Sequence, residues 1–189
     1  MQITEEQNKA FKKIVELIIT ELGENRVVHP ATAISSCARL SGSFMFRSFN
    51  LQVKNASPGN VVLSDEANEK WPVLMNIMRW MLSSHDINID DEKLNKMSKE
   101  KSYMDFLPTL NLLQNLAAAI MSEHKLDFEQ MAYSGAIATF YIIKQCRNDL
   151  DIETAFNTAV MGFIQGCKTY PPDLLSSTPK KKSIFTFWR

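Results

Sequence analysis

The chain has 189 residues, of which 45% are hydrophobic and 22% are charged, values typical of a globular protein that folds as one domain. Lysine plus arginine and aspartate plus glutamate number 21 each, so no excess positive charge steers the chain toward nucleic acid. The longest apolar stretch, near residues 131–143, is too short to span a bilayer, and the first residues lack a signal-peptide pattern. Three cysteines lie within apolar helical patterns, which is typical of buried, reduced thiols in a cytoplasmic protein (Cys37, Cys146 and Cys167).

The hydrophobic period predicts helices through almost the whole chain. The first helix follows Thr4, which forms a capping box with Gln7, and it stops at Gly23. The second begins at Pro30, where a missing N–H costs nothing, and runs to about Phe49. Further helices are predicted from residue 64, after residue 90 as one short exposed turn, over residues 106–124, from residue 127 to 147, and from residue 151 to before residue 171.

Two of the predicted helices carry a stripe of very small residues on one face. In each stripe the four residues recur at positions i, i+4, i+7 and i+11. Glycine lowers helix stability, so we expect it there only where a neighbouring backbone must come close. The stripes therefore predict tight helix crossings, either inside one subunit or across a twofold axis. They consist of Ala31, Ser35, Ala38 and Gly42 in one helix, and of Ala155, Ala159, Gly162 and Gly166 in the other.

Arg39 and Arg47 stand out in a helix that is otherwise made of small and apolar residues. They differ by about 80° around the helix axis, so both cannot face solvent if the rest of the helix is buried. A buried arginine needs a carboxylate or several carbonyl groups as partners. The favoured interpretation is an ion pair with the acidic turn of Asp65, Glu66 and Glu69, and the alternative is a site for an anionic ligand.

Sequence motifs for metal, cofactor or nucleophilic chemistry are absent. The residue three before each of His29, His85 and His124 is not glutamate, which excludes the di-iron pattern of helical bundles. No HExxH, paired CxxC, GxSxG or glycine-rich phosphate loop occurs. The sequence thus predicts no metal, no cofactor and no catalytic residue, and it favours a protein that is not an enzyme.

Residues 171–189 differ from the rest of the chain. They contain three of the seven prolines, three consecutive lysines and the sequence FTFWR. Prolines and serines without an apolar period predict an extended arm rather than a helix. Phe185, Phe187 and Trp188 carry enough apolar area to anchor this arm on the same subunit, a neighbour or another partner. We therefore divide the chain into a helical domain, residues 1–170, and a C-terminal arm, residues 171–189.

Two segments, HPATAISSCARLSGSFMFRSF at residues 29–49 and PGNVVLSDEANEKWPVLM at residues 58–75, resemble an uncharacterised family of small bacterial helical proteins. That family has no assigned activity. The resemblance therefore implies a bacterial, all-helical protein and supplies no functional residue.

Together these patterns predict an all-α, single-domain, compact bundle of about six helices with an extended C-terminal arm. The leading functional hypothesis is a non-enzymatic protein-interaction module that acts as a homodimer. A second hypothesis is a protein, or an enzyme, that binds a small molecule or anion near Arg39, Arg47 and the acidic turn. A third is a peripheral adaptor that is recruited through its basic and aromatic arm.

Overall fold

Helices form almost all of the regular structure, as the hydrophobic period predicts. A computed structural model describes residues 3–25, 27–94 and 102–175. Within these ranges the chain forms six helices of 17 to 19 residues, one helix of four residues, and no strand beyond two isolated β-bridges. The predicted all-α class with about six helices is thus confirmed. The helices are α1 (Glu5–Leu22), α2 (Pro30–Ser48), α3 (Asp65–Ser83), α4 (Asp91–Leu94), α5 (Phe106–Glu123), α6 (Phe128–Cys146) and α7 (Ile152–Lys168).

Four of the six long helices begin at a residue whose side chain caps the first turn, namely α1, α3, α6 and α7. The predicted capping box of Thr4 and Gln7 is confirmed at the start of α1, and Asp127 and Gln130 form a second capping box at the start of α6. These bonds satisfy backbone amides that have no partner within the helix. Helix α3 continues through Pro72, although proline has no N–H to donate to the preceding turn.

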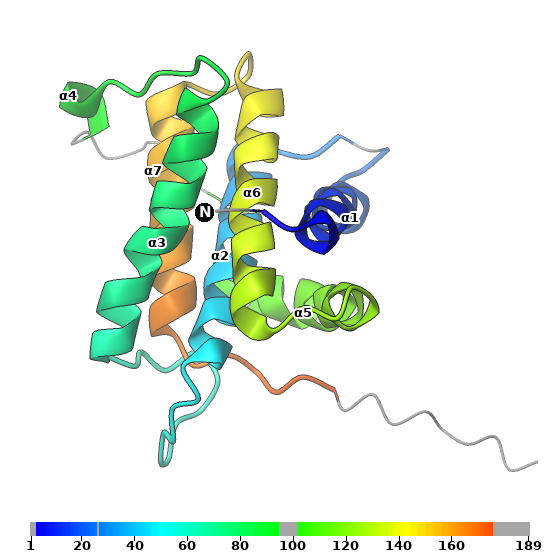
Figure 1. Cartoon of the computed structure of the whole chain (residues 1–189), viewed down its shortest axis with the longest axis vertical. Helices are drawn as coiled ribbons and strands as arrows, with labels where there is room; N and C mark the ends of the chain where they lie inside the picture. The colour runs from blue at the N-terminus through cyan, green and yellow to red at the C-terminus, as the bar shows by residue number, and fades with distance from the viewer. Residues whose placement is uncertain (1–2, 26, 95–101, 176–189) are drawn as a thin grey trace, which may run out of the picture.

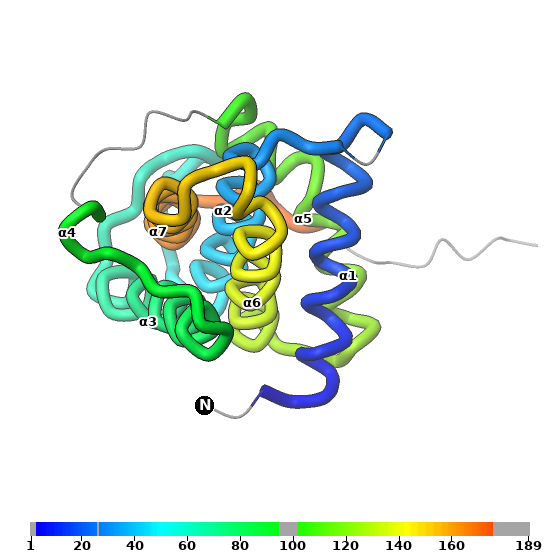
Figure 2. Tube along the Cα trace, turned by 90° about the horizontal axis from the view of Figure 1, so that it is seen from above, coloured from blue at the N-terminus to red at the C-terminus, as the bar shows by residue number. Residues whose placement is uncertain are grey.

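Helix α2 is the centre of the fold. Figure 1 shows α2, α3, α6 and α7 running roughly side by side, whereas α1 and α5 cross them on one flank. Figure 2 shows the same arrangement from above, with α3, α4 and α7 on the other side of α2. Helix α2 contacts every other long helix, and 15 of its 19 residues are buried. A helix that is buried on nearly all sides has to be made of small and apolar residues, as this one is.

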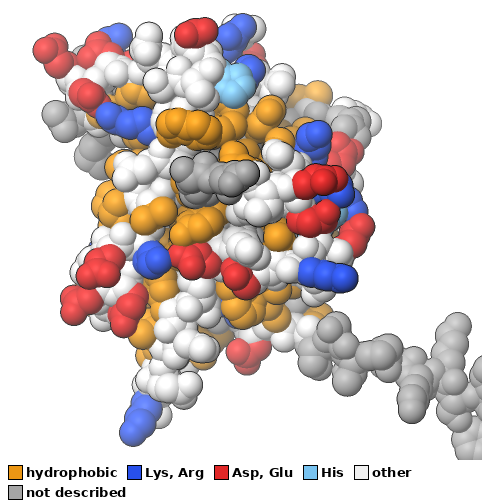
Figure 3. Space-filling model, in the orientation of Figure 1, with side chains coloured by type: hydrophobic (Ala, Val, Ile, Leu, Met, Phe, Trp, Pro, Cys, Tyr) orange, Lys and Arg blue, Asp and Glu red, His pale blue; other side chains and the backbone are white. Residues whose placement is uncertain are grey.

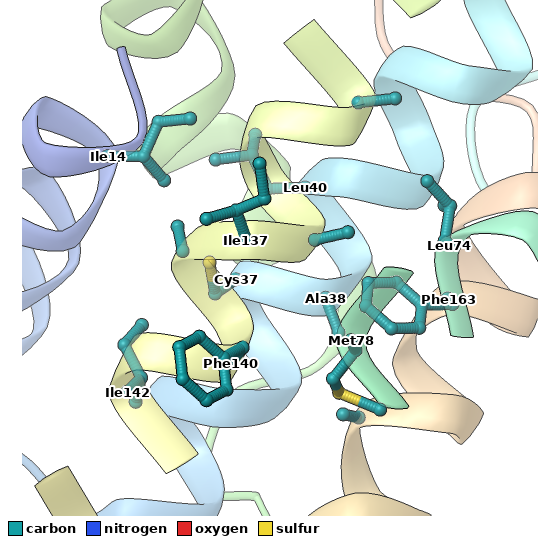
Figure 4. Packing of buried hydrophobic residues seen from close by; sticks show 14 of the residues in the cluster. Ile14, Cys37, Ala38, Leu40, Leu74, Met78, Ile137, Phe140, Ile142 and Phe163 are labelled. Atoms are coloured by element: carbon teal, nitrogen blue, oxygen red, sulfur yellow. The ribbon is translucent and has the colours of Figure 1, made fainter. Parts of the chain in front are cut away.

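The hydrophobic core surrounds α2 and receives large side chains from the helices packed on it. Figure 4 shows Leu74 and Met78 of α3, Phe140 of α6 and Phe163 of α7 directed toward the small residues of α2. Both phenylalanines and Leu74 are fully buried. Bulky residues on the neighbouring helices therefore fill the space that the small residues of α2 leave open.

The two small-residue stripes lie where α2 and α7 cross inside the chain. A Cβ atom placed on Gly42 would lie 2.6 Å from Phe163 O and 2.8 Å from Gly166 Cα. A Cβ atom on Gly162 would lie 2.7 Å from Ala38 Cβ. Residue 38 thus meets 162 and residue 42 meets 166, so the two helices run parallel with their stripes in register. All eight stripe residues are buried.

A second close crossing joins α2 to α6, and the sequence analysis did not identify it. Gly135 faces Ser41, whose Cβ atom would lie 2.7 Å from a Cβ atom on the glycine. Ser41 Oγ also donates a hydrogen bond to Ala132 O of α6 at 2.7 Å. The sequence pattern that indicates this crossing is a second kind of small-residue stripe on one face of α6. It consists of Ala132, Gly135, Ala136 and Thr139.

Candidate functional site

The residues that lead from α7 into the C-terminal arm are held against the helical body, and so is Pro171, the first residue of the arm. After α7 the chain pairs in antiparallel fashion with the loop that precedes α3. Val62 N donates to Lys168 O at 2.7 Å, and Tyr170 N donates to Asn60 O at 2.8 Å. Pro171, which follows, is buried. The beginning of the arm is therefore packed as part of the helical body.

Arg47, near the end of α2, and Gln114, in the middle of α5, hold the next residues of the arm. Arg47 Nη2 donates to Gln114 Oε1 at 2.8 Å and to Pro172 O. Gln114 is only 2% exposed, and its Nε2 donates to Asp173 O at 3.3 Å. Burial lowers the pKa of Arg47, an effect that the charge of Asp173 partly offsets. The guanidinium still remains charged at neutral pH and is directed at neutral oxygen atoms.

The last described residue of the arm, Leu175, lies beside α5. Leu175 N donates to Asn115 Oδ1 at 2.9 Å, and the Leu175 side chain is exposed. We call Arg47, Gln114 and Asn115 the arm seat. Figure 1 shows the arm running from the end of α7 toward the side of the molecule where α5 lies.

One face of α5 is turned to solvent and carries no charge. From Phe106 to Ser122 the helix contains no aspartate, glutamate, lysine or arginine. Leu112 and Leu116 are nevertheless 36% and 44% exposed. A helix face in water normally carries charged side chains, so this face is unusual. We call it the outer face of α5, and it consists of Pro108, Asn111, Leu112, Asn115, Leu116 and Ala119.

The structure does not bring the predicted arginines and the acidic turn together. Arg39 Nε donates to Gln165 Oε1 at 2.6 Å, and its Nη1 donates to Met104 O before α5. Burial lowers the pKa of Arg39, and the charge of Asp105 opposes this shift. Within the described residues neither arginine bonds to a carboxylate. The three predicted carboxylates are exposed near the start of α3, namely Asp65, Glu66 and Glu69.

A shallow hollow of about 550 Å³ lies where α1, α5 and α6 meet. His124 Nδ1 lies 2.7 Å from Glu6 Oε2 there, while the buried His124 Nε2 has no partner among the described residues. Glu6 is also paired with Lys9, and Glu123 is paired with Lys13 at 2.5 Å. Each carboxylate of the hollow therefore has a cationic partner already. The lining consists of Thr4, Glu6, Glu123, His124, Lys125, Leu126 and Gln130.

The described residues give no evidence of metal or thiol chemistry. No group of three histidine, cysteine, aspartate or glutamate residues in them is placed to hold a metal ion. Burial raises the pKa of the Cys37 and Cys167 thiols to about 12, so neither is a thiolate at neutral pH. None of the helices in the described ranges has the length and hydropathy that a bilayer crossing requires.

Sequence reasoning did not identify Gln114 and Asn115. Their only signal is their polarity, because they follow one another in a helix whose neighbouring residues are mostly apolar. The predicted anchor residues Phe185, Phe187 and Trp188 lie outside the described residues.

Comparison of the chain with protein-family models, with curated proteins and with solved structures finds no match. The candidate functional site is therefore defined by geometry alone, as the arm seat together with the outer face of α5.

Proposed function

We propose that this protein is a non-enzymatic interaction module that pairs with a second copy of itself through the outer face of α5. One observation carries the proposal. Helix α5 has no charged residue from Phe106 to Ser122, although Leu112 and Leu116 on its outer face are exposed to solvent. Depletion of charge is the compositional mark of the centre of a protein interface. The face of the molecule shown in Figure 3 carries acidic and basic side chains interspersed with apolar ones.

A second copy fits this face for two reasons. The chain has equal numbers of acidic and basic residues, so two copies do not repel each other through net charge. An uncharged helix face is also self-complementary, because each copy presents leucine side chains flanked by the amide of Asn111. Pairing of one patch with itself across a twofold axis is the commonest closed assembly.

Sedimentation velocity of the full chain over a wide micromolar range tests the proposal. We expect a monomer–dimer equilibrium in the wild type. The double variant Leu112→Lys/Leu116→Lys should weaken the dimer about tenfold or more, because it sets like charges against each other at a twofold contact. The matched control Leu63→Lys/Met161→Lys adds the same charge at two exposed sites outside α5 and should dimerise like the wild type. A wild type that is monomeric at every concentration would refute the proposal.

A second candidate function is the binding of a small anion at Arg47. It is supported by one observation, namely that the bonded partners of this guanidinium among the described residues are neutral oxygens. Phosphate should then raise the melting temperature of the wild type, since a ligand that binds only the folded state stabilises it. The same phosphate should leave Arg47→Met unaffected. Equal shifts in both proteins would exclude this site.

A further inference from the structure

The arm seat delivers the following chain segment to the outer face of α5. Leu175, the last described residue of the arm, is bonded through its backbone to Asn115, which lies on that face. The hydrogen bonds from Arg47 and Gln114 hold the carbonyl groups of Pro172 and Asp173, which precede it in the arm. The described part of the arm therefore ends beside the uncharged, solvent-facing surface of α5 described above, and not at an arbitrary point of the molecule.

The length and composition of residues 176–189 match this surface. Nine residues separate Leu175 from Phe185, and an extended chain of that length reaches about 30 Å. Helix α5 has 18 residues and is about 27 Å long, so the whole face lies within reach. The segment Ile184–Trp188 contains two phenylalanines and a tryptophan, which gain most by leaving water for exposed leucine side chains.

We propose that the outer face of α5 is the docking site for the Ile184–Trp188 segment of the same chain. The segment binds its own subunit because the short tether gives it an effective concentration of about millimolar, above the concentration of a second copy in solution. The residues between, which include Lys180, Lys181 and Lys182, form a hydrophilic spacer. The outer face presents no positive charge to repel these lysines.

Docking has a consequence for self-association, and this part rests on the proposed function. A second copy and the docked segment compete for the same face. Only the fraction of molecules with a free face can dimerise, so the segment reduces the apparent affinity of the dimer. The docking itself does not depend on whether a dimer forms.

Cleavage of the full chain by chymotrypsin tests the docking directly, because this protease cuts after Phe185, Phe187 and Trp188. A docked segment is cut only when it detaches. We expect cleavage there to be about fivefold or more slower in the wild type than in Leu112→Lys/Leu116→Lys, at a concentration where both are monomeric. The control Leu63→Lys/Met161→Lys should be cut as slowly as the wild type. Equal cleavage rates in the wild type and the α5 variant would overturn the proposal.

Binding of the segment at a different place would change the protection of its cleavage sites. Protection that increases with protein concentration would assign the segment to the α5 face of a second copy. Protection that appears only after addition of phosphatidylserine vesicles would assign it to a membrane surface. Either result would overturn docking on the same chain. Trp188 fluorescence, read in a Trp71→Phe/Trp80→Phe background, gives an independent measurement, in which a blue-shifted emission is expected and a fully solvent-exposed emission would contradict the proposal.

The variant Phe185→Ser/Phe187→Ser separates this proposal from the proposed function. It should undock the segment and strengthen the dimer about threefold or more, whereas the matched control Ser176→Thr/Ser177→Thr should leave both unchanged. A protected segment in a chain that never dimerises would refute only the proposed function. A chain that dimerises but whose segment is cut at the same rate in the wild type and in Leu112→Lys/Leu116→Lys would refute only the docking.

Discussion

Helix α2 contacts two of its neighbours in contrasting ways. Against α7 it places backbone directly on backbone, because Gly42 and Gly166 leave no side chain between the two helices. Against α5 and the arm it extends one long polar side chain, Arg47, whose guanidinium reaches Gln114 and the carbonyl of Pro172. The first contact is determined by shape, and the second by hydrogen bonds.

The two contacts differ in the changes they tolerate. The α2–α7 contact has no room for a methyl group, because a Cβ atom on Gly166 would lie 2.5 Å from Arg39 O. Arg47 is only partly buried, so water can replace its acceptors when the arm moves away. Separation of α2 from α7 should therefore require unfolding of the bundle, whereas release of the arm should be a local opening. We expect the arm to detach at lower free energy than the bundle unfolds.

The largest effect is expected at the backbone contact. The variants Gly42→Ala and Gly166→Ala each add a methyl group against backbone atoms that cannot move independently of their helix. Each should lower the free energy of unfolding by about 3 kcal/mol, the upper part of the range for overpacking. Alanine is the better helix former, so helix propensity alone predicts the opposite sign. Urea unfolding followed by circular dichroism measures the difference.

Asn68→Ala is the control for these glycine variants. Asn68 is exposed in α3, so this variant isolates the gain in helix propensity from any change in packing. It should be as stable as the wild type or slightly more so. Glycine variants that behave like Asn68→Ala would contradict the close contact between α2 and α7.

A smaller and more local effect is expected at the hydrogen-bonded contact. Arg47→Met removes the donor to Gln114 and Pro172 and should cost about 2 kcal/mol, because both acceptors lose a charged partner. The amide of Leu175, which is bonded to Asn115, should also exchange its hydrogen faster than in the wild type. Hydrogen exchange read by mass spectrometry resolves this peptide.

Arg39→Met is the matched control, because Arg39 bonds to Gln165 and Met104 and not to the arm. It should lower stability without accelerating exchange at Leu175. An arm that exchanges at the same rate in the wild type and in Arg47→Met would show that Arg47 does not hold it.

The helical contacts were largely predictable from the sequence, since they follow from spacing. A stripe at i, i+4, i+7 and i+11 has a fixed place on a helix surface whatever the rest of the chain does. Gly42 and Gly166 could thus be recognised as contact residues before their partners were known. The all-α class followed from the same periodicity. The pairing of the two stripes in parallel could not be derived, because four other helices separate them in the chain.

The partners of the arginines were not predictable, since backbone carbonyls leave no trace in a sequence. The favoured interpretation paired Arg47 with the carboxylates of the acidic turn, whereas its partners in the structure are the carbonyl of Pro172 and the amide oxygen of Gln114. The outer face of α5 could have been found from the run without charge between Phe106 and Ser122. That run also fits a buried helix, and only the fold distinguishes these two cases.

The smallest expected effect concerns a third kind of contact, an ion pair near the surface. Lys70 of α3 lies 2.8 Å from Glu129 at the start of α6, and Tyr133 donates to the same carboxylate. The hydrogen bond from Lys70, followed by that from Tyr133, lowers the pKa of Glu129 below its usual value of 4.5. The Glu129 side chain is 37% exposed, so solvent screening limits the contribution of the pair to about 1 kcal/mol or less.

The pH dependence of this contribution has a definite sign. Because the pKa of Glu129 is lower in the folded state, the stabilisation is fully present above the unfolded value near 4.5 and is lost as the pH falls through the folded value. Glu129→Gln should therefore be less stable than the wild type at pH 7, and the difference should shrink below pH 4.5. Glu66→Gln makes the same charge change at an exposed site of α3 and is the control. A Glu129→Gln deficit that stays constant down to low pH would contradict this assignment to the Glu129 charge, because glutamine carries no charge but keeps an oxygen that can accept the hydrogen bond from Tyr133.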